Sequence, residues 1–184
     1  MDKSVGNKGP VWRLAAAGIL LALLVAWQAA TAPIGITILT GSGVNLILAV
    51  AAIAVGARYG ALISLISPVA AKLVGIGPLW EIIPFIALGN IVLVLIWHFL
   101  GKGSRSYARL GLTAVVAAAV KFAVLYLGIV RIMIPLVLEL PEKQTGVISA
   151  TFSVPQLITA LIGGVLAVLA RPLIARALGS GRER

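Results

Sequence analysis

Six polar side chains lie within or at the ends of long apolar stretches, and their types indicate a ligand-binding site. They are Asn45, Lys72, Glu81, Asn90, Lys121 and Gln156. A polar group is costly inside a membrane, so it usually faces a bundle interior or a water-filled cavity. Two lysines and one carboxylate would leave such a site net positive. A ligand with a carboxylate, a phosphate or an electron-rich heteroaromatic edge would complement it. Trp80, beside Glu81, could stack on the same ligand.

The chain carries no arrangement that is typical of an enzyme. It contains no HExxH or GxSxG pattern, and Gly101-Lys102-Gly103-Ser104 lacks the upstream glycine and the spacing of a P-loop. The absence of cysteine excludes disulfides and thiolate metal sites. We therefore expect no enzymatic activity, no catalytic residue, no metal site and no cofactor.

The composition is typical of a membrane protein. The 184 residues are 61% apolar and 11% charged, and the mean hydropathy is +1.13, whereas a soluble domain is about 45 to 50% apolar and about 25% charged. Six spans of about 20 residues would use nearly the whole chain. The net charge of +10 could suggest nucleic acid. The basic residues, however, lie in short tracts between apolar runs, so membrane orientation explains them better and we expect no nucleic-acid partner.

The apolar runs predict an all-α membrane protein with six transmembrane helices in a single domain, residues 1–184. The predicted helices cover about residues 12–31, 43–57, 60–76, 82–100, 108–128 and 147–171. The first two would be joined by a turn-rich loop that contains Pro33, Gly35, Gly41, Ser42 and Gly43. The first apolar run is too long for a cleavable signal, so it should be retained as the first helix.

The distribution of basic residues predicts that both termini are cytoplasmic. Six spans place the termini on one side, and that side would then hold eleven of the fifteen Lys and Arg residues. Only Arg131 and Lys143 would lie outside. The prediction is a multi-pass protein of a bacterial or archaeal plasma membrane.

The six polar residues all fall in the outer halves of the predicted helices. The inner stretches, residues 50–56, 91–97 and 161–170, hold no strong polar side chain, and His98 comes only at the inner boundary. A channel or a self-sufficient carrier would be expected to line both halves of its path. The pattern therefore predicts a cup that opens outward and is closed toward the cytoplasm.

Structural interpretations of the same residues remain open. Lys72 could extend to the outer interface, and Lys121 could be neutralised by Glu81 in a structural pair. Asn90 and Gln156 could hold helices together through hydrogen bonds. Trp80 could anchor the chain at the membrane interface, as aromatic residues often do.

A stripe of small residues follows the first predicted helix. Gly18, Ala22, Ala26 and Ala30 recur every four residues, which aligns them in one groove where another helix can approach closely. The partner could be another protein. It could also be the chain's own sixth helix, through Ala160, Gly163, Gly164 and Ala167.

The sequence resembles the S components of energy-coupling factor (ECF) transporters, the membrane subunits that capture vitamins and related micronutrients. The likeness covers almost the whole chain. Beyond the six spans and the small-residue first helix, it rests on Thr40-Gly41-Ser42-Gly43-Val44-Asn45, Gly56-Ala57-Arg58-Tyr59-Gly60-Ala61, Pro84-Phe85-Ile86-Ala87-Leu88-Gly89-Asn90, Lys121-Phe122, and the stretch from Phe152 to Ala160.

The resemblance implies a function that composition does not. An S component binds its substrate from outside and then topples in the membrane on a transmembrane coupling subunit driven by two ATPase subunits. The family's gating loop would correspond to about residues 31–43. The family's alanine-x-x-x-alanine contact with the coupling subunit would correspond to Ala22 and Ala26, although that motif often lies nearer the cytoplasmic end, where Ala15, Ala16 and Ala17 also stand.

Two other functions fit the sequence. An independent proton- or sodium-coupled carrier would use Glu81 as its coupling carboxylate, and the apolar inner half counts against it. A membrane assembly subunit would bind no small molecule and use the alanine groove only for helix association.

Overall fold

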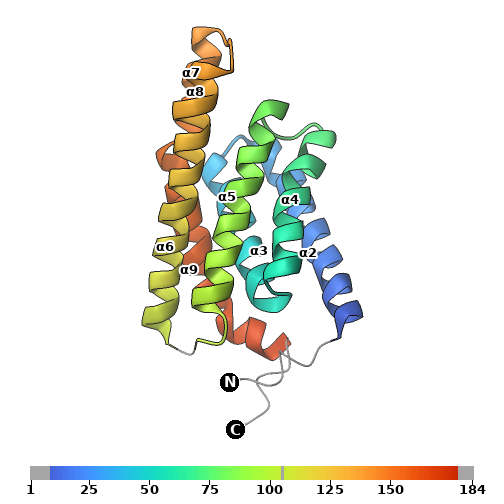
Figure 1. The fold of residues 1–184 in the computed structure, drawn as a ribbon. Helices are drawn as coiled ribbons and strands as arrows, with labels where there is room; N and C mark the ends of the chain where they lie inside the picture. Colours follow the sequence, from blue (N-terminus) through green and yellow to red (C-terminus); the bar gives the residue numbers. More distant parts are fainter. Residues whose placement is uncertain (1–8, 105, 178–184) are drawn as a thin grey trace.

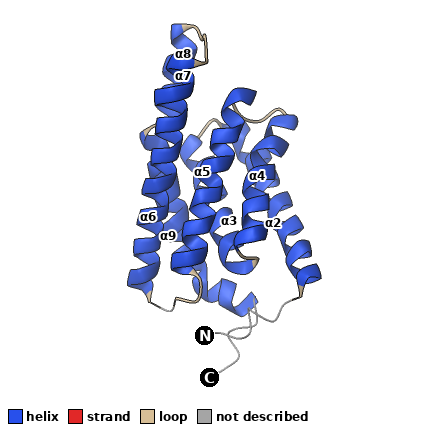
Figure 2. Ribbon diagram, viewed as in Figure 1, coloured by secondary structure: helices blue, strands red, loops and turns tan. Residues whose placement is uncertain are grey.

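The computed structural model describes residues 9–104 and 106–177, and this part of the chain is helical and contains no strand (Figure 2). Within it, six helices pack side by side (Figure 1). They are α2 (Pro10–Thr31), α3 (Thr37–Ala54), α4 (Ala57–Leu73), α5 (Ile83–Ile96), α6 (Tyr107–Leu125) and α9 (Val154–Ala177). Shorter segments are the 3₁₀ turns Ala32–Ile34 and Trp80–Ile82, the π-helical segments Trp97–Gly101 and Tyr126–Met133, and helices α7 (Ile134–Leu136) and α8 (Glu142–Thr151).

The helices are long and apolar enough for a multi-pass membrane protein. Five segments of the described chain meet the length and composition of a span: Pro10–Ile34, Thr37–Ala54, Trp80–Gly101, Tyr107–Leu136 and Glu142–Arg176. The remaining helix, α4, has 17 residues, which is about 26 Å at 1.5 Å per residue. It is therefore slightly shorter than a hydrocarbon core of about 30 Å.

The first described helix begins, and the last described helix ends, on the same side of the bundle. We call the end at which α2 begins and α9 ends the terminal end, and the opposite end the distal end (Figure 1). This arrangement fits the even number of crossings expected from the sequence. The fold does not say which end faces the cytoplasm, so the orientation stays a prediction.

The second helix differs most from the sequence-based boundaries. It was expected over 43–57 after a turn-rich loop, but α3 begins at Thr37 and ends at Ala54, so Gly41 and Gly43 are helical. A Cβ atom at Gly41 would lie 2.8 Å from Thr159 Cγ2, and one at Gly43 would clash with the indole ring of Trp27. These glycines therefore let neighbouring side chains approach α3, and this packing outweighs their low helix propensity.

The last two predicted helices also have different bounds. The expected helix 108–128 continues through the π-helical segment Tyr126–Met133 into α7, so the helical run ends at Leu136. The expected helix 147–171 is divided into α8 and α9 around Phe152 and Ser153. The tip of the α6–α7–α8 hairpin projects beyond the other helices at the distal end (Figure 1). The other three predicted helices differ less from the observed ones. The helix predicted over 12–31 is observed as Pro10–Thr31, and the one predicted over 60–76 as Ala57–Leu73. The helix predicted over 82–100 is α5 with the π-helical segment that ends at Gly101.

Small residues on α9 let it pack closely against α3 and α6. A Cβ atom at Gly163 would lie 2.6 Å from Asn45 Cβ and 2.7 Å from the Ser42 carbonyl oxygen, and one at Gly164 would lie 2.8 Å from Ala114 Cβ. Without a hydrophobic driving force between helices in lipid, such close backbone approach supplies much of the packing energy. The α9 glycines thereby set its distance from α3, which carries Asn45.

Candidate functional site

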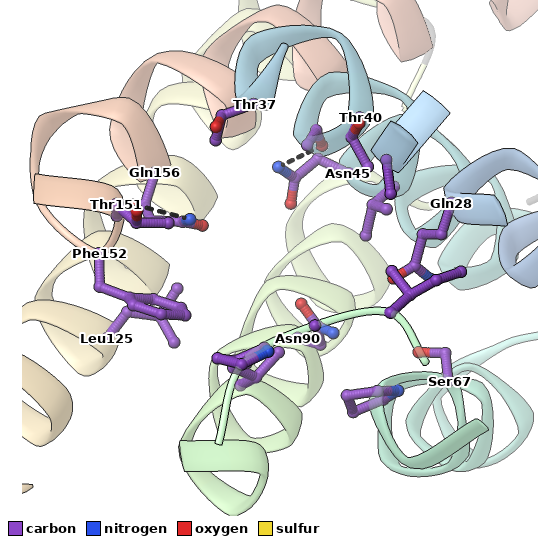
Figure 3. Close-up of a pocket in the computed structure, with 18 of the residues that line it drawn as sticks. Gln28, Thr37, Thr40, Asn45, Ser67, Asn90, Leu125, Thr151, Phe152 and Gln156 are labelled. Carbon is purple, nitrogen blue, oxygen red and sulfur yellow. Dashed lines mark hydrogen bonds between the residues drawn. The ribbon is translucent and has the colours of Figure 1, made fainter. Parts of the chain in front are cut away.

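A cavity of about 320 Å³ opens between the distal halves of the helices. Its volume lies at the lower end of the range of roughly 300 to 1,000 Å³ that small-molecule pockets occupy. In Figure 3, Gln156, Thr151 and Phe152 lie across the cavity from Gln28 and Ser67. The side chains of its lining that carry hydrogen-bonding groups are Gln28, Thr37, Thr40, Asn45, Ser67, Asn90, Lys121, Thr151 and Gln156.

A hydrogen-bonded network forms the floor of this cavity. Lys121 Nζ on α6 donates to Asn45 Oδ1 on α3 at 2.6 Å and to Asn90 Oδ1 on α5 at 2.7 Å. All three side chains are buried, with 2 to 3% of their surface exposed. A lysine Nζ can make three hydrogen bonds. The network therefore joins three helices and uses two of the three donors of a lysine ammonium.

The lysine also determines how the two amides are oriented. Because Nζ only donates, the oxygens of Asn45 and Asn90 must face it and their NH₂ groups must point elsewhere. Asn45 Nδ2 donates to the Gly41 carbonyl oxygen at 2.9 Å and to Thr159 Oγ1 at 3.4 Å. Thr159 Oγ1 in turn donates to the Gln156 carbonyl oxygen at 3.1 Å. The chain of hydrogen bonds thus extends to α9.

Apolar packing lies directly below the network on the side of the terminal end. One turn further along their helices, Leu48, Leu93 and Ala117 are at most 1% exposed. Deeper still, Trp97 is 1% exposed and fills the space beside Gly101 and Gly164. Thr113, a buried polar residue at this level, donates its hydroxyl to the Arg109 carbonyl oxygen. The cavity therefore has a polar lining at the distal end, and apolar side chains separate it from the terminal end.

The structure brings four of the seven sequence-predicted binding residues together. Asn45, Asn90, Lys121 and Gln156 line the cavity. Asn45 had been expected at the outer start of its helix, but the earlier start of α3 places it about 12 Å in, close to the depth of Asn90. That shift lets both amides reach the same lysine.

The other three predicted residues do not line this cavity. Lys72 is half-buried near the end of α4, and Trp80 and Glu81 are exposed on the 3₁₀ turn before α5. The alternative pairing of Lys121 with Glu81 is not formed, because Lys121 bonds the two asparagines. The charge of the cavity lining consequently comes from Lys121 alone among the described residues.

Several residues of the lining were not among those predicted from the sequence. Gln28 and Ser67 are polar residues in apolar runs, so their position was a usable signal. Thr37 and Thr40 gave no such signal, because their segment was expected to be a loop. Phe152 supplies an aromatic wall from the break between α8 and α9, and a break inside an uncharged run leaves little trace in the sequence.

The small-residue stripe of α2 faces away from the bundle. Gly18, Ala22 and Ala26 are all exposed, and a Cβ atom at Gly18 would meet nothing within 4 Å. The α9 glycines instead pack against α3 and α6. These contacts therefore do not support packing of the α2 stripe on α9 within the same chain.

Comparison with protein-family models, with curated proteins and with solved structures finds no match for this chain. A cavity with one buried cation, several amide and hydroxyl groups and an aromatic wall can bind a small polar molecule. It holds no described pair of groups poised for acid–base or nucleophilic chemistry.

Proposed function

We propose that this chain is the substrate-binding subunit of an importer of the ECF type. In this role it captures a vitamin or related micronutrient from outside the cell and passes it on with the help of an ATP-driven coupling module. It performs no catalysis itself. The proposal takes the distal end as the outer face, which the positive-inside distribution of Lys and Arg favours.

The observation that carries this proposal is the one-sided cavity. Polar side chains converge at the distal end, whereas Leu48, Leu93 and Trp97 close the path toward the terminal end with dry packing. A receptor that hands its cargo to a partner needs a binding site with a single opening. A carrier that works alone would also need polar groups along the path through this barrier.

The cavity lining favours a small ligand with a hydrogen-bonding edge. The third donor of Lys121 and the amide of Asn90 would bind a carboxylate, a phosphate or a heteroaromatic nitrogen. Phe152 would stack on a flat ring from the opposite wall. Because Lys72 is not part of the lining, the site has one cation rather than two, which favours a ligand with a single negative charge or a polar heteroaromatic ring.

The exposed stripe on α2 supports the second half of the proposal. Gly18, Ala22 and Ala26 would let a helix of the coupling subunit approach closely, and two ATPase subunits would act through that subunit. The chain has no P-loop of its own, so ATP hydrolysis would have to come from such partners.

Native mass spectrometry of protein purified from its own host in mild detergent tests the proposal directly. We expect a stoichiometric small molecule and co-purifying coupling and ATPase subunits. The mass of the retained molecule would identify the substrate. A chain that is empty, binds nothing in a micronutrient panel and recruits no ATPase would contradict the proposal and leave a membrane assembly subunit as the better explanation.

A matched pair of serines on α4 tests whether the ligand occupies this cavity. Ser67 lines the cavity, whereas Ser64 is fully buried and donates to the Gly60 carbonyl oxygen. Loss of one ligand hydrogen bond in Ser67→Ala should weaken binding about fivefold. Ser64→Ala should leave the affinity unchanged. Equal affinities for the two variants would place the ligand elsewhere.

The ion-coupled carrier is distinguished by transport in reconstituted vesicles. Its expected coupling carboxylate, Glu81, is exposed and is not part of the cavity lining. We expect the purified chain alone to bind substrate and not to accumulate it, with or without a proton or sodium gradient. Gradient-driven accumulation that is lost in Glu81→Gln would favour the carrier.

A further inference from the structure

A second cavity, of about 510 Å³, lies at the terminal end, away from the candidate ligand site. Three basic side chains from three different segments line it: Arg13 of α2, Arg58 of α4 and Lys102, which directly follows the π-helical end of α5. His98 and Tyr59 complete its polar lining. None of its described lining residues is acidic, and the carboxylates of the described part, those of Glu81, Glu139 and Glu142, belong to distal segments.

We propose that this cavity binds the negatively charged headgroup of a phospholipid, with its phosphate held by Arg58 and Lys102. The proposal concerns a site that is separate from the distal cavity and does not depend on what that cavity binds. The positive charges of Arg58 and Lys102 line one cavity and repel each other, and a bound anion would offset that repulsion. A phosphate offers three or more acceptor oxygens to such a group of donors.

The environment of Lys102 disfavours its positive charge. Partial burial lowers the pKa of the Lys102 ammonium below its usual value, and the nearby positive charge of Arg13 lowers this pKa further. Both effects disfavour the charged lysine. An anion in the cavity would act in the opposite direction, so its binding would raise the Lys102 pKa.

The residues that line this cavity also carry backbone donors without helical acceptors. Gly56 is the N-cap of α4 with φ +89° and ψ 178°, no side chain caps this helix, and the first helical bond runs from Gly60 N to the Gly56 carbonyl oxygen. The N–H groups of Ala57, Arg58 and Tyr59 therefore have no acceptor within the helix, and all three residues line the cavity. These donors add to the basic side chains at the positive end of the helix dipole.

His98 is held in place at this cavity. Its Nδ1 lies 3.2 Å from the Ala52 carbonyl oxygen, which can only accept, so Nδ1 carries the hydrogen. A Cβ atom at Gly56 would lie 3.6 Å from His98 Cε1. That distance is ordinary van der Waals contact, so the positive φ of Gly56 is what explains a glycine between α3 and α4.

The position of the cavity favours a lipid over a soluble anion. Lys102 follows the last residue of the span Trp80–Gly101, so the cavity lies where headgroups meet the ends of helices. Val11 and Leu14, close to Arg13 in the sequence, and Phe99, three residues before Lys102, are 80%, 63% and 69% exposed. Acyl chains can cover such side chains while the headgroup enters the cavity, and inorganic phosphate cannot.

The experiment compares three probes on the purified chain: short-chain phosphatidylglycerol, short-chain phosphatidylcholine and inorganic phosphate. Phosphatidylglycerol should raise the thermal unfolding midpoint and be retained in native mass spectra. In Arg58→Gln/Lys102→Gln its apparent affinity should fall about twentyfold. The charge-matched control Arg131→Gln/Lys143→Gln alters cations of the distal segments, and its affinity should equal that of the unmodified chain.

Three outcomes would overturn the proposal. Equal retention of phosphatidylcholine would mean that the cavity does not select an anionic headgroup. Equal protection by inorganic phosphate at the same concentration would mean that the anion need not belong to a lipid. Equal loss of affinity in the two double variants would mean that phosphatidylglycerol responds to overall charge and not to this cavity.

Discussion

Lys121 Nζ lies 2.7 Å from Asn90 Oδ1, and this buried bond joins α6 to α5 at the floor of the distal cavity. The same nitrogen bonds Asn45 on α3. A group that holds three helices together and also faces the cavity links the stability of the bundle to the shape of the site. Effects of substitutions here must therefore be separated into those on folding and those on binding.

We expect Lys121 and Asn90 to be energetically coupled. Lys121→Met leaves two buried amide oxygens without their donor, and Asn90→Leu removes one acceptor of the lysine. Each substitution should lower the free energy of unfolding by about 1 to 3 kcal/mol. The double variant should lose less than the sum, by about 0.5 to 3 kcal/mol. Reversible unfolding in mixed detergents measures all four corners of this cycle.

Lys72→Met is the control for that cycle. Lys72 is half-buried near the end of α4 and is not part of the cavity lining. Its substitution should change the free energy of unfolding by no more than about 0.5 kcal/mol. Additive effects of Lys121→Met and Asn90→Leu would contradict the network as the structure has it.

Gly163 should be intolerant of even one added carbon. A Cβ atom there would lie 2.7 Å from the Ser42 carbonyl oxygen and 2.8 Å from Leu46 N, which are backbone atoms that cannot rotate away. Gly163→Ala must therefore push α9 away from α3, at a cost of about 1 to 3 kcal/mol. Because α3 carries Asn45, ligand affinity should fall as well.

Gly111→Ala is the matched control for Gly163→Ala. Gly111 lies within α6, and a Cβ atom there would meet nothing within 4 Å. The helix propensity of alanine should stabilise this variant by up to about 1 kcal/mol. Thermal unfolding of the two variants should therefore shift in opposite directions. A stable Gly163→Ala variant with unchanged affinity would show that the contact between α3 and α9 is looser than described.

The helical membrane fold follows from composition and from the lengths of the apolar runs, and these were predictable. The candidate site was only partly predictable. Asn90, Lys121 and Gln156 stood out as polar residues inside apolar runs. Lys121 bonds two asparagines and not Glu81 because α3 places Asn45 deep in the bundle. The residues near Asn45 do not indicate this depth.

The segment from Gly41 to Gly43 shows why the depth of α3 was missed. Glycine and serine close together usually indicate a turn, because they have low helix propensity. Here the missing side chains make room for Thr159 and Trp27, and Trp27 Nε1 donates to the Thr40 carbonyl oxygen at 3.1 Å. Contacts between distant helices thus outweigh a local preference that is all the sequence pattern records.

Ser42 and Ser64 should respond in opposite ways to alanine. Ser42 Oγ is buried and has no hydrogen-bond partner in the described part of the chain, whereas Ser64 Oγ donates to the Gly60 carbonyl oxygen at 2.9 Å. Ser42→Ala removes an unsatisfied hydroxyl and should stabilise the protein by about 1 kcal/mol, whereas Ser64→Ala should destabilise it by about 0.5 to 1.5 kcal/mol. A destabilised Ser42→Ala variant would reveal a partner for this hydroxyl.

The exposed face of α2 makes the sharpest distinction between binding and transport. Ala22 and Gly18 face away from the bundle, so Ala22→Phe should change the free energy of unfolding by no more than about 0.5 kcal/mol and leave ligand affinity unchanged. If a helix of the coupling subunit packs on this face, the added ring keeps it at a distance, and uptake by whole cells should fall about tenfold or more.

Leu169→Phe on α9 is the control for Ala22→Phe, because Leu169 is 66% exposed and does not belong to the small-residue stripe. Uptake by this variant should equal that of the unmodified chain. Normal uptake by Ala22→Phe would place the contact with the coupling subunit elsewhere. Loss of ligand affinity in Ala22→Phe would instead mean that α2 affects the cavity from within the chain, through Trp27 and Gln28 on the same helix.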